Sequence, residues 1–150
     1  MKKTTLIILL FPLLVLAQEK ITQVNYVNHL IDIPENCTAN SEFEVNCDNF
    51  SAQWLYLSEE MYNQNLHKEF INQFKSQTNA KKIGETELHS WEDRLIAEKY
   101  TITSGNILLY KVLAYGKVNN QYLLLNLTFE KDIQSNEDLP ELARKIVEFK

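Results

Sequence analysis

The stretch NILLYKVLAYGKVNNQYLLLNLTFEK, residues 106–131, predicts two long strands joined by a turn. The first arm, 107–115, is rich in Leu, Val, Ile and Tyr, which strands favour. Neither arm keeps the 3.6-residue spacing of an amphipathic helix, which is the competing interpretation. Side chains alternate along a strand, so one face of the second arm, 122–129, is entirely apolar. That face carries Leu123, Leu125, Leu127 and Phe129.

The segments around this hairpin predict an α+β fold, mainly an antiparallel sheet with one long amphipathic helix and a C-terminal helix packed on it. Ser58 is a good N-cap for a helix that ends near Gln77. We expect its apolar stripe to contain Tyr62, Leu66, Phe70 and Phe74. A final helix, led by Asn136 or Asp138, carries an apolar stripe through residue 149. We expect helices over one face of the sheet, with the other face partly solvated.

Three further regions have strand character. Residues 21–33 predict one strand that ends at Pro34, which lacks an N–H donor. Residues 50–57 predict a second strand. Residues 82–102 favour two strands with a turn near Glu92 and Asp93, although a short helix over 91–98 remains an alternative.

The first residues have the pattern of a secretory signal peptide. Lys2 and Lys3 form a positive region, and 6–16 is an apolar run too short to span a bilayer comfortably. We expect cleavage after Ala17, so residues 1–17 are the signal peptide and 18–150 form a single α+β domain. The protein is then periplasmic or secreted, with no stable membrane insertion after cleavage.

The two cysteines, Cys37 and Cys47, predict one disulfide, because an exported chain meets an oxidising compartment. A turn centred near Glu42 would place them opposite each other in a hairpin. The acidic residues around them disfavour a reactive thiolate.

The charge balance disfavours one class of partner, nucleic acid. Without Lys2 and Lys3 the chain has 13 basic and 20 acidic residues, a net charge of −7. Nucleic acid is disfavoured as a partner because phosphate binding needs a positive surface.

A search for catalytic or metal-binding motifs finds none in the sequence. We therefore assign no catalytic residue, no metal site and no cofactor. His29, His67 and His89 lie far apart in the chain, and Glu92 and Asp93 are adjacent carboxylates. Convergence of two or three of these side chains in a pocket would favour an enzyme, and their scatter would favour a binding protein.

Aromatic residues are the remaining binding candidates, because Tyr and Trp provide contact area at low entropic cost. Several could share a sheet face that no helix covers, although a place in the core is the alternative. The candidate binding residues are Trp54, Tyr56, Trp91, Tyr110 and Tyr122, with Tyr100 and Tyr115 in the wider set.

The order of elements resembles the PsbP-like α/β/α sandwich domains. The resemblance rests on the Ile-Asp-Ile-Pro-Glu run at 31–35, the strand at 122–129 and the helix at 139–149. It implies a role in protein binding or assembly without catalysis, and it transfers no functional residue.

These observations lead to a primary hypothesis of an exported, non-enzymatic binding or adaptor protein that contacts another protein. One special case is an envelope immunity-type protein, whose acidic charge would suit a basic toxin. The alternatives are a small-ligand-binding protein or hydrolase with an unrecognised pocket, and a structural envelope protein joined through a free sheet edge.

Overall fold

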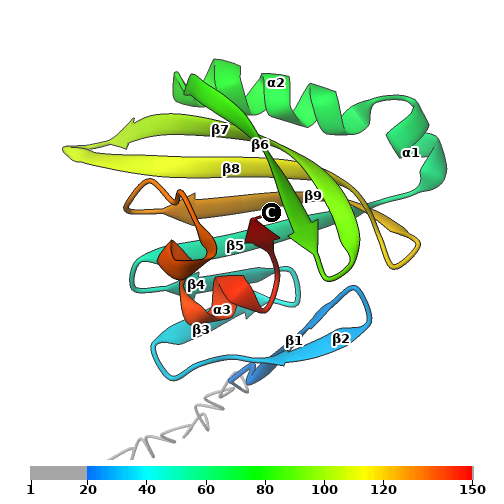
Figure 1. The fold of residues 1–150 in the computed structure, drawn as a ribbon, viewed down its shortest axis with the longest axis vertical. Helices are drawn as coiled ribbons and strands as arrows, with labels where there is room; N and C mark the ends of the chain where they lie inside the picture. The colour runs from blue at the N-terminus through cyan, green and yellow to red at the C-terminus, as the bar shows by residue number, and fades with distance from the viewer. Residues whose placement is uncertain (1–19, 150) are drawn as a thin grey trace, which may run out of the picture.

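The computed structural model describes residues 20–149, and the predicted leader at 1–17 lies outside them. Eight antiparallel strands form one strongly curved sheet in the order β10-β6-β7-β8-β9-β5-β4-β3, beside a separate β1–β2 hairpin (Figure 1). The elements are β1 (Gln23–Tyr26), β2 (His29–Asp32), β3 (Cys37–Ser41), β4 (Glu44–Cys47), β5 (Phe50–Leu57), α1 (Glu59–Asn63), α2 (Leu66–Thr78), β6 (Lys81–Ser90), β7 (Asp93–Ser104), β8 (Ile107–Val118), β9 (Gln121–Phe129), the 3₁₀ turn η1 (Asn136–Asp138), α3 (Glu141–Arg144) and β10 (Glu148–Phe149). The predicted α+β class is confirmed.

The central hairpin is β8 and β9, as the sequence predicts. Val118 pairs with Gln121, so the turn has two residues, Asn119 and Asn120, with φ of 45° and 65°. Two positive φ angles suit the turn type that matches strand twist, and Asn tolerates them.

The apolar face of β9 is the centre of the main core. Leu123, Leu125, Leu127 and Phe129 are at most 2% exposed. We call this side of the sheet the inner face, and the side that carries Tyr122 and Leu124 the outer face.

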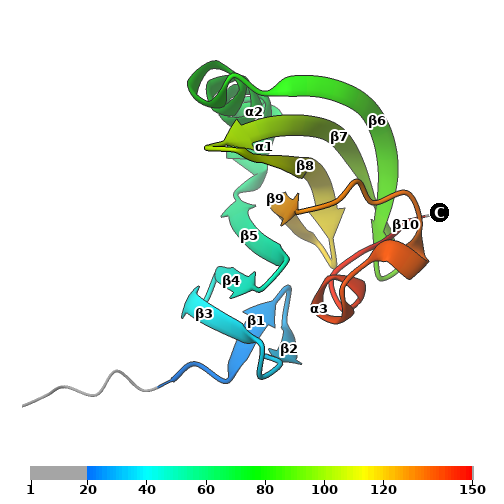
Figure 2. The same ribbon diagram turned by 90° about the vertical axis from the view of Figure 1, so that its left-hand side faces the viewer.

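The two helical regions lie on opposite sides of the sheet, not over one face as expected (Figure 2). Leu142 and Ala143 of α3 pack in the inner core, whereas Ile71 of α2 packs on Tyr100 and Leu113 of the outer face. The outer face therefore has its own small apolar cluster, which gives α2 a surface to bury.

The predicted long helix is divided into α1 and α2. Ser58 caps α1 as predicted, and its side chain accepts a hydrogen bond from Met61 N. Asn65 has a left-handed φ of 61°, which interrupts the helix and changes the direction of the side chains after it. The buried side of α2 consequently contains His67 and Ile71, while Phe70, predicted on the buried stripe, is exposed.

The N-terminal region, predicted as one strand over 21–33, is instead the β1–β2 hairpin. The chain reverses at Val27 and Asn28, whose φ angles are 49° and 66°. A β-branched residue at positive φ is costly, so Val27 argues locally against a turn that Asn28 alone would tolerate. The Val27 side chain is 2% exposed, and its N–H donates to the Tyr56 hydroxyl at 2.7 Å, so tertiary contacts offset the strain.

Strand pairing decides two of the predictions, the structure of residues 82–102 and the disulfide between Cys37 and Cys47. Residues 82–102 belong to strands β6 and β7, which meet at a turn containing Trp91, so the helical alternative is wrong. Cys37 and Cys47 are direct partners in the β3–β4 hairpin and form the predicted disulfide.

The C-terminal helix is much shorter than predicted. Only 141–144 are α-helical, and the chain then extends into β10, where Glu148 pairs with His89 of β6. The Asn136 side chain accepts from Phe149 N at 2.6 Å and donates to Phe149 O at 2.8 Å. This amide acts as a strand partner and favours the extended ending over another helical turn.

Candidate functional site

The five predicted binding aromatics do not form one surface. Trp54 is 4% exposed and packs edge-on against Tyr26, with ring centroids 5.3 Å apart. Its ring belongs to the inner core and is unavailable to a partner. Tyr110 is half-buried against the same core, next to its strand partner Phe129.

Tyr56 and Trp91 hold the β1–β2 hairpin against the sheet. The Tyr56 hydroxyl, which accepts from Val27 N, also lies 3.3 Å from Asn25 O. The Trp91 ring packs against His29 at 4.0 Å between centroids. These contacts give both residues a structural role, although Trp91 remains 36% exposed.

Tyr122 belongs to a run of stacked rings on the outer face. Tyr122 stacks on Tyr62 at 4.4 Å, Tyr62 on His67 at 4.3 Å, and His67 lies 4.6 Å from Tyr115. The run joins α1, α2, β8 and β9 in one aromatic layer.

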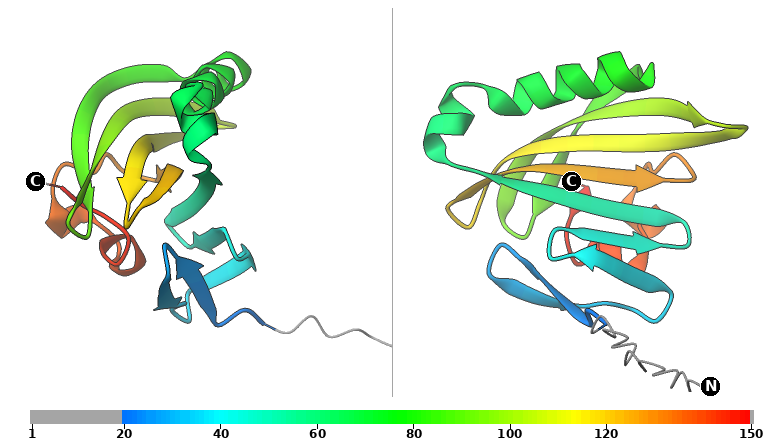
Figure 3. Two further views of the ribbon diagram at one scale, coloured as in Figure 1. Left: turned by 90° about the vertical axis from the view of Figure 1, so that its right-hand side faces the viewer. Right: turned by 180° about the vertical axis from the view of Figure 1, so that it is seen from behind.

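An open depression of about 400 Å³ lies beside this layer. We call it the tyrosine groove, lined by Tyr62, Asp93, Arg94, Ile96, Tyr115, Gly116, Lys117 and Tyr122. It lies at the end of the sheet where β8 turns into β9 and where α1 approaches the strands (Figure 3).

Strand register determines which side chains form the floor of the tyrosine groove. Ile96 of β7 is the direct partner of Tyr115 of β8, and Lys117 is the partner of Tyr122. Partners on neighbouring strands point to the same face of a sheet. Tyr62 arrives from the helical side because α1 ends just before the turn at Asn65.

His67 supports the tyrosine groove from behind. It is 3% exposed, and its Nδ1 makes no hydrogen bond to any residue of 20–149. Burial, with a smaller effect of Lys68, lowers the pKa of His67, so the stacked imidazole is neutral at pH 7. Burial also raises the pKa of Tyr62 and of Tyr115, which keeps both hydroxyls protonated.

The charged groups around the tyrosine groove differ in how they are partnered. Arg94 lies 2.5 Å from Glu87, and Asp93 accepts a hydrogen bond from Asn119 N at 2.7 Å. The Lys117 amine lies 5.0 Å from the centre of the Tyr122 ring. No ion pair joins Lys117 to another of residues 20–149.

The histidines and carboxylates considered as catalytic candidates do not converge. His29 packs on Trp91, His67 lies in the aromatic layer, and His89 contacts Glu87 at 3.2 Å. Asp93 borders the tyrosine groove, while Glu92 is exposed in the β6–β7 turn. Within residues 20–149, no three His, Cys, Asp or Glu side chains gather as metal ligands would.

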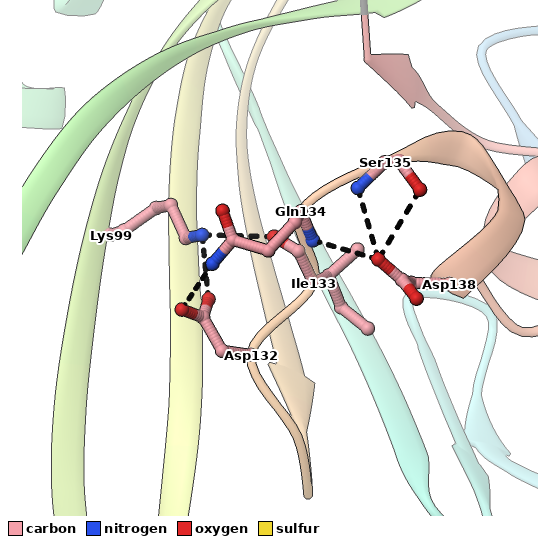
Figure 4. A network of polar contacts seen from close by, with 6 residues as sticks. All are labelled: Lys99, Asp132, Ile133, Gln134, Ser135 and Asp138. Carbon is pink, nitrogen blue, oxygen red and sulfur yellow. Dashed lines mark hydrogen bonds and ion pairs between the residues drawn. The ribbon is translucent and has the colours of Figure 1, made fainter.

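A second polar cluster has a structural explanation (Figure 4). The Lys99 amine of β7 lies 2.6 Å from Asp132 and donates to Ile133 O at 2.8 Å. Asp138 accepts from the backbone N–H groups of Gln134 and Ser135, both at 3.1 Å. The cluster fastens the segment after β9 to the inner face.

Lys111 is a half-buried lysine under α2. Its amine donates to Asn126 Oδ1 at 2.9 Å and lies 5.5 Å from the centre of the Phe74 ring. Burial lowers the pKa of Lys111 to about 8 from the usual 10.5. A depressed lysine pKa means that charging the amine costs stability in the folded protein.

We therefore expect the free energy of unfolding to rise by about 1 kcal/mol between pH 8 and 9, because the unfolded chain keeps the Lys111 proton that the folded one releases. Urea titrations of the wild type and of Lys111→Met measure this. The variant should lack the rise, and an equal rise in both proteins would contradict the assignment. Above pH 10 stability should fall in both, because burial raises the pKa of Tyr26 and of Tyr100.

Most of the tyrosine groove was not predicted from the sequence. The sequence makes Tyr122 a candidate binding residue and places Tyr115 in the wider aromatic set and Asp93 among the titratable candidates, but its periodicity assigns Tyr62 to the buried helical stripe. No sequence pattern marks Ile96 or Lys117 as part of a site. Asn65, a residue type that tolerates positive φ, is the local feature that indicates a break in the helix. Because the helix breaks there, Tyr62 does not share one continuous apolar stripe with the residues of α2.

No helix within residues 20–149 has the length and hydrophobicity needed to cross a bilayer. No protein-family model matches this chain, and a search of curated proteins finds no significant match. Any function must therefore be argued from the site itself.

Proposed function

We propose that this protein is an exported, non-enzymatic binding protein that contacts another protein through the tyrosine groove. The observation that carries the proposal is the open, aromatic-lined depression beside Tyr62, Tyr115 and Tyr122. Tyr and Arg are the residue types that contribute most energy at protein interfaces, and Arg94 lies at the rim. Ile96 is 50% exposed on the floor, an apolar surface that a partner would cover.

The state of the titratable groups favours binding over catalysis. His67, the histidine nearest to the tyrosine groove, has both ring faces against tyrosines and is almost fully buried. A general base must reach the proton it removes, and this imidazole has no open path to a substrate. Asp93 is already engaged by a backbone N–H.

Export to the periplasm or medium is part of the proposal. It rests on the leader pattern at 1–17 and is supported by the Cys37–Cys47 disulfide, since such bonds persist mainly in oxidising compartments. The resemblance to PsbP-like adaptor domains and the immunity-type hypothesis are consistent with a protein partner, and both stay predictions.

A small-ligand-binding role is the second candidate. The volume of about 400 Å³ falls in the range of small-molecule pockets. The groove is an open depression, however, whereas small-molecule sites usually enclose most of their ligand.

A pull-down from the native envelope or medium, with the exported chain as bait, tests the proposal. We expect one stoichiometric protein to bind the wild type and to lose at least about tenfold in affinity for Tyr122→Ala, as for a loss of 1.4 kcal/mol at an interface hot spot. Phe43→Ala is the matched control, since it removes a 46% exposed ring at the β3–β4 turn.

Two outcomes would oppose the proposal. A partner held equally by the wild type and Tyr122→Ala would exclude the tyrosine groove as the interface. A co-purifying small molecule that Tyr122→Ala loses, with no protein partner, would favour the second candidate.

A further inference from the structure

The aromatic rings of the tyrosine groove leave little free ring face to a ligand. Tyr62 is stacked between His67 and Tyr122, at 4.3 and 4.4 Å, so both of its faces are covered. The Lys117 amine also lies against the Tyr122 ring. A flat ligand that needs an aromatic platform, such as a sugar ring or a nucleobase, would find these faces taken.

The tyrosine groove does offer an apolar floor. Ile96 is half exposed, and its strand partner Tyr115 continues the floor toward β9. An aliphatic side chain of a partner would remove this surface from water, which is favourable in proportion to the apolar area covered.

In the part of the chain that the structure describes, one cation among the charged side chains that border this floor is free to pair with a charge on a ligand. Glu87 neutralises Arg94, whereas Asp93 keeps its negative charge and accepts a hydrogen bond from the backbone N–H of Asn119. Lys117 is a cation without an ion-pair partner among residues 20–149. The complementary group on a ligand is therefore a carboxylate, within reach of the side chain that covers Ile96.

The net charge of −7 that remains without Lys2 and Lys3 does not oppose this local preference. Repulsion between exposed charges is largely screened beyond about 8 Å at physiological ionic strength, whereas a direct contact with Lys117 is screened only in part. A carboxylate is thus favoured in the tyrosine groove where it contacts Lys117 directly.

We propose that the tyrosine groove binds an extended acidic segment of a partner protein, with an aliphatic side chain on Ile96 and Tyr115 and a neighbouring carboxylate on Lys117. This inference rests on the proposed function and specifies which part of the partner enters the site. The edges and hydroxyls of the tyrosines then face the backbone of the segment, where they supply hydrogen bonds.

Fluorescence anisotropy with three labelled, end-capped heptapeptides tests the inference on the full exported chain. Each peptide has a central Leu, flanked on both sides by Asp, by Asn or by Lys. We expect the Asp peptide to bind about threefold more tightly than the Asn peptide, the effect of one exposed ion pair, and the Lys peptide to bind most weakly. The Asp preference should decline as salt is raised.

Matched variants assign the two contacts. Lys117→Gln should abolish the preference for Asp over Asn, while Lys75→Gln, an exposed lysine in the last turn of α2, should keep it. Ile96→Ala should weaken all three peptides. Leu55→Ala, which removes a 40% exposed aliphatic side chain outside the groove, should not.

Equal binding of the Asp and Asn peptides by the wild type would overturn the acidic preference, and the proposed function would stand if Tyr122→Ala still lost its captured partner. Binding of cellohexaose in place of every peptide would overturn the inference in favour of a glycan. Failure of all peptides, together with a pull-down that yields no partner, would remove the inference and the proposed function together.

Discussion

Leu125→Ala should lower the free energy of unfolding by about 2–5 kcal/mol, the range for buried Leu-to-Ala changes. Leu125 is fully buried at the centre of β9, and its strand partners on the same inner face are Trp54 of β5 and Ala114 of β8. Truncation removes apolar burial and leaves a cavity that these rigid strands can fill only in part. Urea denaturation monitored by far-UV circular dichroism measures the loss.

Leu55→Ala is the control for this prediction. Leu55 lies on the neighbouring strand β5 but is 40% exposed, so the same truncation should cost less than about 1 kcal/mol. A loss near zero for Leu125→Ala, or equal losses for the two variants, would show that the inner and outer faces of the hairpin are wrongly assigned.

Removal of the Cys37–Cys47 disulfide should cost about 2.5–3 kcal/mol. The two cysteines are ten positions apart, and in the chain-entropy model a cross-link over a loop of this size removes that much conformational freedom from the unfolded chain. The double variant Cys37→Ala/Cys47→Ala, compared with the oxidised wild type in urea denaturation, measures the loss. The β3–β4 hairpin should still form in this variant, because the buried Val45 side chain of β4 continues to pack in the core.

Chemical labelling checks the premise of this second prediction. In the native exported protein neither thiol should react with a maleimide unless a reductant is present. Ready labelling of both cysteines without reductant would show that the pair is reduced. In that case the double variant should unfold at the same urea concentration as the wild type.

Features that depend on a few neighbouring residues were predictable. The alternation of Leu123, Leu125 and Leu127 identifies a strand with one buried face, because side-chain direction along a strand has a period of two. Ser58 identifies a helix start, because its hydroxyl can reach an N–H three residues ahead. The strand pair at 82–102 and the disulfide hairpin follow from the same kind of local evidence.

The errors occur where distant contacts override local preference. Val27 adopts a positive φ because Tyr56, 29 positions away, binds its N–H. The final helix gives way to β10 because β6 offers a strand edge at His89 and the Asn136 side chain holds Phe149. In each case the free energy gained from contact with a residue far along the chain exceeds the local conformational preference, which is about 1 kcal/mol per residue.

The sequence by itself determined the class of fold, the central hairpin, the disulfide pairing and the cap of the first helix, since each is encoded within a short window of residues. Only the tertiary structure decided the tyrosine groove. Its parts come from α1, β7, β8 and β9, and they meet because strand register and the left-handed Asn65 bring them to one end of the sheet. A binding surface of this kind depends on which strands are neighbours, and strand order is set by packing of the whole chain rather than by any one segment.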